Sequence, residues 1–202
     1  DCGPKDAPAV RLLHGFGASL HTWEPWAQAL DATYRVIRID LPGSGLTGAD
    51  PTNDYTDARA VRLLVALLDR LDVPRASVIG NSVGGRIAWK LAALHPDRVE
   101  KLVLISPDGF ASPGFAYHVR TEVPAVLGLM RYALPKGMLR MNLAPAYGDP
   151  ARIEDATLTR YHDLMRAPGV RTAMLARLEQ GFVHLPDHAA RAVACALDLD
   201  AF

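Results

Sequence analysis

Two hydrophobic periods alternate along the first half of the chain. Short apolar, β-branched runs are separated by longer stretches in which apolar residues recur every three or four positions. The runs predict strands at 10–13, 35–40, 76–80 and 99–105, and the longer stretches predict helices at 23–32, 57–71 and 83–95. Strands that alternate with helices at this spacing indicate a mostly parallel sheet with helices on both faces. We therefore expect an α/β fold whose ligand crevice lies beyond the carboxyl ends of the strands.

The second half of the chain lacks this alternation. Between residues 110 and 181 no strand is predicted, prolines interrupt the helical stretches, and all five methionines of the chain occur. This pattern predicts a helical lobe inserted after a strand. Methionine fills irregular gaps between helices and also lines binding surfaces. Of these two interpretations we favour packing.

The charge and cysteine counts exclude several classes of protein. The 22 basic and 22 acidic residues balance, which argues against a nucleic-acid partner. No apolar run reaches the roughly 18 residues of a transmembrane helix. Cys2 and Cys195 allow at most one disulfide, so the chain is no disulfide scaffold. We expect one globular domain with an inserted lobe, no membrane span, and the cytoplasm as its default location.

The sharpest candidate for chemistry is Gly80-Asn81-Ser82-Val83-Gly84, which matches G-x-S-x-G. It lies between a predicted strand and a predicted helix, as a nucleophile elbow requires. Glycines permit the tight turn, and the serine hydroxyl then lies at the positive end of a helix. The sequence therefore predicts Ser82 as a nucleophile. The alternative is a plain glycine-rich turn between strand and helix.

A second glycine-rich segment, His14-Gly15-Phe16-Gly17, follows the first predicted strand. Glycines there let a backbone N–H approach a ligand closely. The N–H groups of Phe16 and Val83 could together form an oxyanion hole, which stabilises the charge of a tetrahedral intermediate. The alternative is a simple turn, and for His14 itself we favour a role in shaping the loop.

A third glycine pattern, G-x-G-x-x-G at 43–48, invites a dinucleotide-binding interpretation that we reject. That fingerprint must open a helix directly, whereas the following segment, 50–54, is loop-like, and no acidic strand end comes about 20 residues later. The sequence has no G-x-x-x-x-G-K-S/T, no H-E-x-x-H and no cysteine–histidine metal pattern. We therefore predict a loop here and neither a cofactor nor a metal.

Four segments together resemble the α/β-hydrolase family, in its cap-bearing esterase and lipase-like branch. They are HGFGASLHTW (14–23), RVIRIDLPGSGLT (35–47), VIGNSVGG (78–85) and HPDRVEKLVLISP (95–107). Their order and spacing match the family from its third strand through its sixth. The resemblance implies an incomplete α/β-hydrolase core at 1–110, a helical cap at 111–181 and a C-terminal tail at 182–202.

The resemblance also implies a site and a reaction. Ser82 would be the nucleophile, and the backbone N–H groups of Phe16 and Val83 would be the oxyanion donors. The implied reaction is hydrolysis of a small or medium carboxylic ester, a small-molecule substrate, through an acyl-enzyme. A serine at this position also argues against the dehalogenases and epoxide hydrolases of the fold, which have aspartate there.

The sequence departs from the family where the rest of the triad belongs. The family's order is Ser, then Asp or Glu, then His, yet the 21 residues after Gly181 show no strand pair to carry the last two. Either the chain is a fragment, or His184 or His188 reaches the serine with Asp108 as the acid. For each of these three residues we favour an ordinary surface or loop position. Two other functions stay open, a carbon–carbon bond hydrolase and a catalytically incomplete hydrolase-like fragment or binding protein.

Overall fold

The computed structural model describes residues 1–109, 128–144, 147 and 149–180. The described residues form a four-stranded parallel sheet in the order β2-β1-β3-β4. Its strands are β1 (Ala9–Leu13), β2 (Arg35–Ile39), β3 (Ala76–Asn81) and β4 (Val99–Ile105). The predicted strands and the α/β fold are confirmed. Because β1 pairs with both β2 and β3, the order of strand addition reverses there, and ligands bind at such a switch point.

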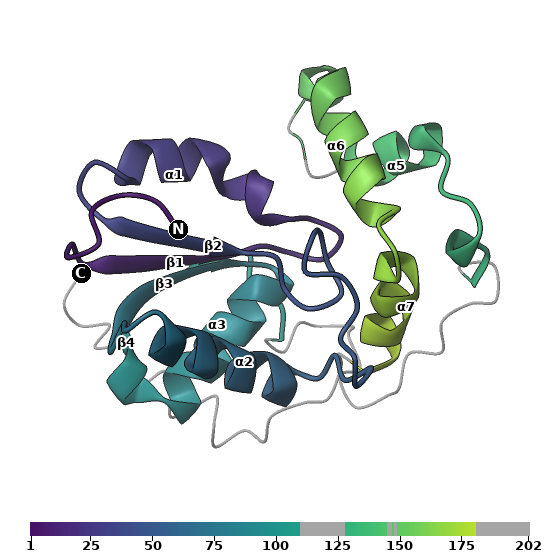
Figure 1. Ribbon diagram of the computed structural model, residues 1–202. Coiled ribbons are helices and arrows are strands. Elements are labelled where there is room, and N and C mark those ends of the chain that lie inside the picture. Colours follow the sequence, from purple (N-terminus) through teal and green to yellow (C-terminus); the bar gives the residue numbers. More distant parts are fainter. Residues whose placement is uncertain (110–127, 145–146, 148, 181–202) are drawn as a thin grey trace.

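Helices cover both faces of this sheet (Figure 1). A 3-10 turn (Leu20–Trp23) leads into α1 (Glu24–Leu30) on one face. On the other face lie α2 (Asp57–Arg70) and α3 (Val83–Leu94), and a short 3-10 turn (Pro96–Arg98) leads from α3 into β4. The three helices occur where the hydrophobic period predicts them.

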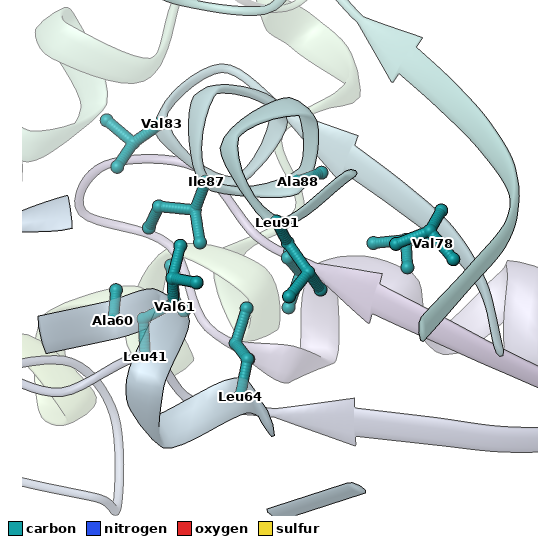
Figure 2. Packing of buried hydrophobic residues seen from close by; sticks show 11 residues of the cluster. Leu41, Ala60, Val61, Leu64, Val78, Val83, Ile87, Ala88 and Leu91 are labelled. Atoms are coloured by element: carbon teal, nitrogen blue, oxygen red, sulfur yellow. The ribbon is translucent and has the colours of Figure 1, made fainter. Parts of the chain in front are cut away.

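The main hydrophobic core lies where α2 and α3 meet the sheet. In Figure 2, Val61 and Leu64 of α2 face Ile87 and Leu91 of α3. All four side chains are almost fully buried, as is Val78 of β3 beside them. Burying one such side chain contributes about 1.5 to 3 kcal/mol, so this spacing of apolar residues is what fixes both helices on the sheet.

The other described helices pack around a hydrophobic cluster of their own. They are α5 (Lys136–Leu143), α6 (Asp155–Met165) and α7 (Val170–Gln180), with 3-10 turns at Leu129–Arg131 and Pro150–Arg152. In Figure 1 this helical lobe stands beside the sheet. Met165 and Met174 belong to its buried cluster, whereas Met141 is exposed. In residues 128–180, as far as they are described, the lobe has no strand, as predicted.

Two further predictions from the sequence concern the domain boundaries and membrane-spanning helices. The boundaries of the predicted core, cap and tail stay predictions, and the tail at 182–202 lies outside the described residues. None of the helices in the described ranges is long and apolar enough to cross a membrane.

Candidate active site

Ser82 occupies the sharp turn between β3 and α3. Its φ of 51° and ψ of −120° are rare for a residue with a side chain. The backbone is held on both sides, since the Ser82 N–H donates to the Ile105 carbonyl at 3.1 Å and its carbonyl accepts from Arg86 at 3.0 Å and Asp108 at 3.1 Å. Strain of this kind persists only where neighbours enforce it, and it is concentrated at functional sites.

Glycines make the close approaches around this turn possible. A Cβ on Gly80 would lie 2.4 Å from the Gly84 carbonyl oxygen, and one on Gly84 would lie 2.3 Å from that of Leu13. A Cβ on Gly15 would lie 3.2 Å from the Ser82 Cβ. The motif therefore has the strand–turn–helix setting that the sequence predicts, and the loop after β1 lies directly against Ser82.

A small pocket lies beside the turn. Phe16 and Val83 line it from the core side, and Met174 and Arg177 of α7 line it from the helical lobe. Among the backbone hydrogen bonds of the described residues, none is donated by Phe16 or Val83. Val83 is the first residue of α3, where an N–H has no partner within the helix. In the described part of the chain neither N–H group therefore has a backbone acceptor, and Ser82 itself is not among the residues that line this pocket.

His14 holds the loop after β1 in place. Its side chain is buried, with Nδ1 2.8 Å from the Gly15 carbonyl oxygen and Nε2 3.0 Å from the Leu41 N–H. The Nδ1–H tautomer satisfies both contacts, because Nδ1 then donates and Nε2 accepts. Burial lowers the pKa of His14 from its ordinary 6.5, and the Gly15 carbonyl and Asp40 oppose this shift. With both nitrogens engaged, the neutral ring shapes the loop, as the sequence suggests.

The lowered pKa of His14 predicts a loss of stability toward acid pH. Below about pH 7 the unfolded chain protonates this histidine at its ordinary pKa while the folded chain does not, so the free energy of unfolding falls as the pH falls. One such group contributes at most about 1.4 kcal/mol per pH unit. Urea unfolding at pH 7.5, 6.5 and 5.5 measures the slope, and His14→Gln should make it shallower. The matched variant His95→Gln changes a histidine outside the pocket. An equal slope in wild type and His14→Gln would contradict the prediction.

Asp108, the suggested acid, makes its closest charged contact with an arginine. Its Oδ2 lies 2.6 Å from Arg86 Nη1, and its carbonyl accepts from Trp89 Nε1 at 3.3 Å. Among the described residues, no histidine hydrogen-bonds to the hydroxyl of Ser82 or to this carboxylate. His184 and His188 lie outside the described residues. The described part of the chain therefore holds the serine and the loop beside it but supplies no base.

The glycine-rich segment at 43–48 is a loop, as predicted. Ser44 and Gly48 form an isolated antiparallel bridge, and the next helix begins only at Asp57. The segment therefore does not open a helix directly, as a dinucleotide-binding fingerprint would. In the ranges that the structure describes, no three His, Cys, Asp or Glu side chains are grouped so that they could hold a metal ion.

Sequence reasoning missed Arg177 as a residue of this region. Its Nη2 donates to the Pro42 carbonyl, and its side chain is buried although it carries a charge. A signal for it exists in the sequence, because Arg177 continues the buried stripe of Val170, Ala173 and Met174 at helical spacing. A charged residue on an apolar stripe indicates a specific contact.

Comparison with known proteins places the chain in a family. A family model described as alpha/beta hydrolase fold matches residues 8–144. The dihydrolipoyllysine-residue acetyltransferase component of an acetoin cleaving system from Pseudomonas putida is 32% identical over 174 residues, 86% of this chain and 45% of that protein. A 2-hydroxy-6-oxo-6-phenylhexa-2,4-dienoate hydrolase from Comamonas testosteroni is 36% identical over 118 residues, 55% of this chain and 40% of that protein. The chain thus spans less than half the length of either relative.

Solved structures agree with this assignment. A hydrolase from Pseudomonas aeruginosa superposes with a TM-score of 0.68 and 26% identity, covering 89% of this chain and 67% of that one. The enol-lactonase from Burkholderia xenovorans gives a TM-score of 0.75 at 24% identity, covering 95% of this chain and 72% of that one, which shows the shared fold. The family model matches more than half of the chain. The resemblance seen in the sequence is confirmed, and the chain belongs to the alpha/beta hydrolase fold family.

Proposed function

We propose that the protein is a serine hydrolase that cleaves a small or medium carboxylic ester through an acyl-enzyme on Ser82. The observation that carries the proposal is the strained turn at Ser82, with the loop after β1 packed directly against it. A strained serine at the start of a helix, behind a parallel strand, is the arrangement that presents a hydroxyl to a substrate carbonyl. Membership of the alpha/beta hydrolase fold family supports the same reaction class.

In this proposal each group has a defined task. The Ser82 oxygen attacks the ester carbonyl carbon, and the N–H groups of Phe16 and Val83 donate to the oxyanion that forms. Collapse of this intermediate releases the alcohol, which takes the proton removed from the serine, and water then hydrolyses the acyl-enzyme. A serine without a base is a weak nucleophile at neutral pH. The base is therefore sought beyond α7, where His184 and His188 are the candidates in the sequence, and Asp108 stays the candidate acid.

The test is turnover of p-nitrophenyl butyrate by the purified chain, followed by mass spectrometry of the acid-quenched enzyme. We expect release of p-nitrophenol and a butyryl group on the peptide that contains Ser82, because acyl-enzyme formation and hydrolysis are separate steps. Butyryl-labelled peptides elsewhere in the chain would contradict Ser82 as the nucleophile. A folded chain without turnover would contradict the esterase and favour a catalytically incomplete binding protein.

A second candidate reaction for the same site is hydrolysis of a carbon–carbon bond in a diketone. It is favoured by two relatives. One is the 2-hydroxy-6-oxo-6-phenylhexa-2,4-dienoate hydrolase from Comamonas testosteroni, at 36% identity, and the other is a 2-hydroxy-6-oxononadienedioate/2-hydroxy-6-oxononatrienedioate hydrolase from Paraburkholderia phymatum, at 32%. The same serine and oxyanion donors would serve, since both substrates pass through attack on a carbonyl. Turnover of 2-hydroxy-6-oxo-6-phenylhexa-2,4-dienoate at a higher kcat/KM than the butyrate ester would select this reaction over the esterase.

A further inference from the structure

One charged side chain of the helical lobe reaches the pocket beside the strained turn. Arg177 of α7 is only 6% exposed and lines this pocket together with Phe16 and Val83. Its Nη2 donates to the Pro42 carbonyl, and its Cζ lies 5.7 Å from the centre of the Tyr55 ring. Because the guanidinium is planar, these two contacts fix its orientation in the pocket wall.

The other terminal nitrogen of Arg177, Nη1, is buried and donates to no acceptor among the described residues. Burial lowers the pKa of Arg177 and the charge of Asp57 raises it, but the Asp57 carboxylate already pairs with Arg86 and Lys90. A buried donor of a charged group that makes no hydrogen bond is costly, and its position in a pocket wall would let a bound anion satisfy it.

We infer that Arg177 binds a carboxylate of the substrate, so that the site selects half-esters of dicarboxylic acids over neutral esters. The inference rests on the proposed function, in which Phe16 and Val83 hold the oxyanion of the same substrate. All three residues line one small pocket, so the carbonyl and the carboxylate of one substrate would bind next to each other there. The guanidinium suits this role because its N–H groups match the geometry of a carboxylate and form strong charge-assisted hydrogen bonds.

The test compares p-nitrophenyl hydrogen adipate with p-nitrophenyl methyl adipate, which has the same chain but no charge. For the wild-type chain we expect a higher kcat/KM with the half-ester. In Arg177→Gln the ratio of the two kcat/KM values should fall about 10- to 100-fold, the range expected for a lost hydrogen bond to a charged group. Arg171→Gln, on the same helix but outside the pocket, should keep the wild-type ratio. Arg177→Lys, which keeps the charge without the planar group, should give an intermediate ratio.

Two outcomes would overturn the inference. If Arg177→Gln and Arg177→Lys slow both esters equally, Arg177 only holds α7 on the loop at Pro42. If the wild-type chain shows no preference for the half-ester, its pocket does not bind a carboxylate.

A binding measurement keeps this test separate from the proposed function. If no ester is turned over, the proposed hydrolase fails, and calorimetric titration with the monoanilide of adipic acid still tests Arg177. Binding that weakens about 10-fold or more in Arg177→Gln supports the inference. Equal binding by both chains, or none by the wild type, overturns it.

Discussion

Replacing Ser82 with alanine is expected to lower kcat/KM for p-nitrophenyl butyrate by about 10⁴- to 10⁶-fold, the range found when an activated serine nucleophile is removed. Alanine keeps the Cβ and therefore the backbone strain at φ 51°, so the loss would come from the hydroxyl alone. The size of the loss also shows whether a base is present. A decrease of only a few-fold would mean that water attacks the ester directly and that Ser82 is not activated.

Ser106 supplies the matched control for this experiment. It lies at the end of the neighbouring strand, is exposed, and also has a positive φ, 43°. Ser106→Ala should leave kcat/KM close to that of the wild type. Ser82→Gly gives a second control, because glycine adopts this backbone conformation without strain. Ser82→Gly should be as inactive as Ser82→Ala, and it should unfold at a higher temperature than Ser82→Ala. Equal activity in Ser82→Gly and the wild type would contradict Ser82 as the nucleophile.

The elements that the sequence predicts are those whose signals are local. The period of apolar residues specifies α2 and α3, and Figure 2 shows the predicted stripe residues Val61 and Leu64 facing α3. The turn at Ser82 was predictable for the same reason, since Gly80 and Gly84 can be read beside it and the structure shows the backbone contacts that require them. Local patterns thus indicate where the chain turns and which helix faces are buried.

Contacts between distant segments leave no such pattern. The predicted apolar strand β1 contains Arg11, which is fully buried and donates from Nη1 to the Leu64 carbonyl at 2.9 Å. Burial lowers the pKa of Arg11 to about 10. Arg177 likewise donates a hydrogen bond to the carbonyl of Pro42, which is 135 residues away in the sequence. The helical spacing can indicate that Arg177 is buried, but the partners of both arginines become evident only from tertiary packing.

Asp57 makes a third contact of this kind, and replacing it with alanine is expected to lower the free energy of unfolding by about 3 to 5 kcal/mol. Its buried carboxylate pairs with two residues of α3. Oδ2 lies 3.1 Å from Arg86 Nε and also contacts Lys90 Nζ. Without it, two buried cations lose the anion that they share. Asp57 is also the first residue of α2, where a negative charge favours the helix dipole.

The expected size of this effect comes from burial and not from the mere presence of an ion pair. Asp69 of the same helix pairs with Arg98 at 2.7 Å, yet its side chain is 62% exposed. Asp69→Ala should therefore cost no more than about 1 kcal/mol, because water screens the pair and replaces its hydrogen bonds. Urea unfolding of the two variants under identical conditions measures the difference. A loss of about 1 kcal/mol or less for Asp57→Ala as well would contradict the prediction, because the pairs of Asp57 with Arg86 and Lys90 would then contribute no more than an exposed pair.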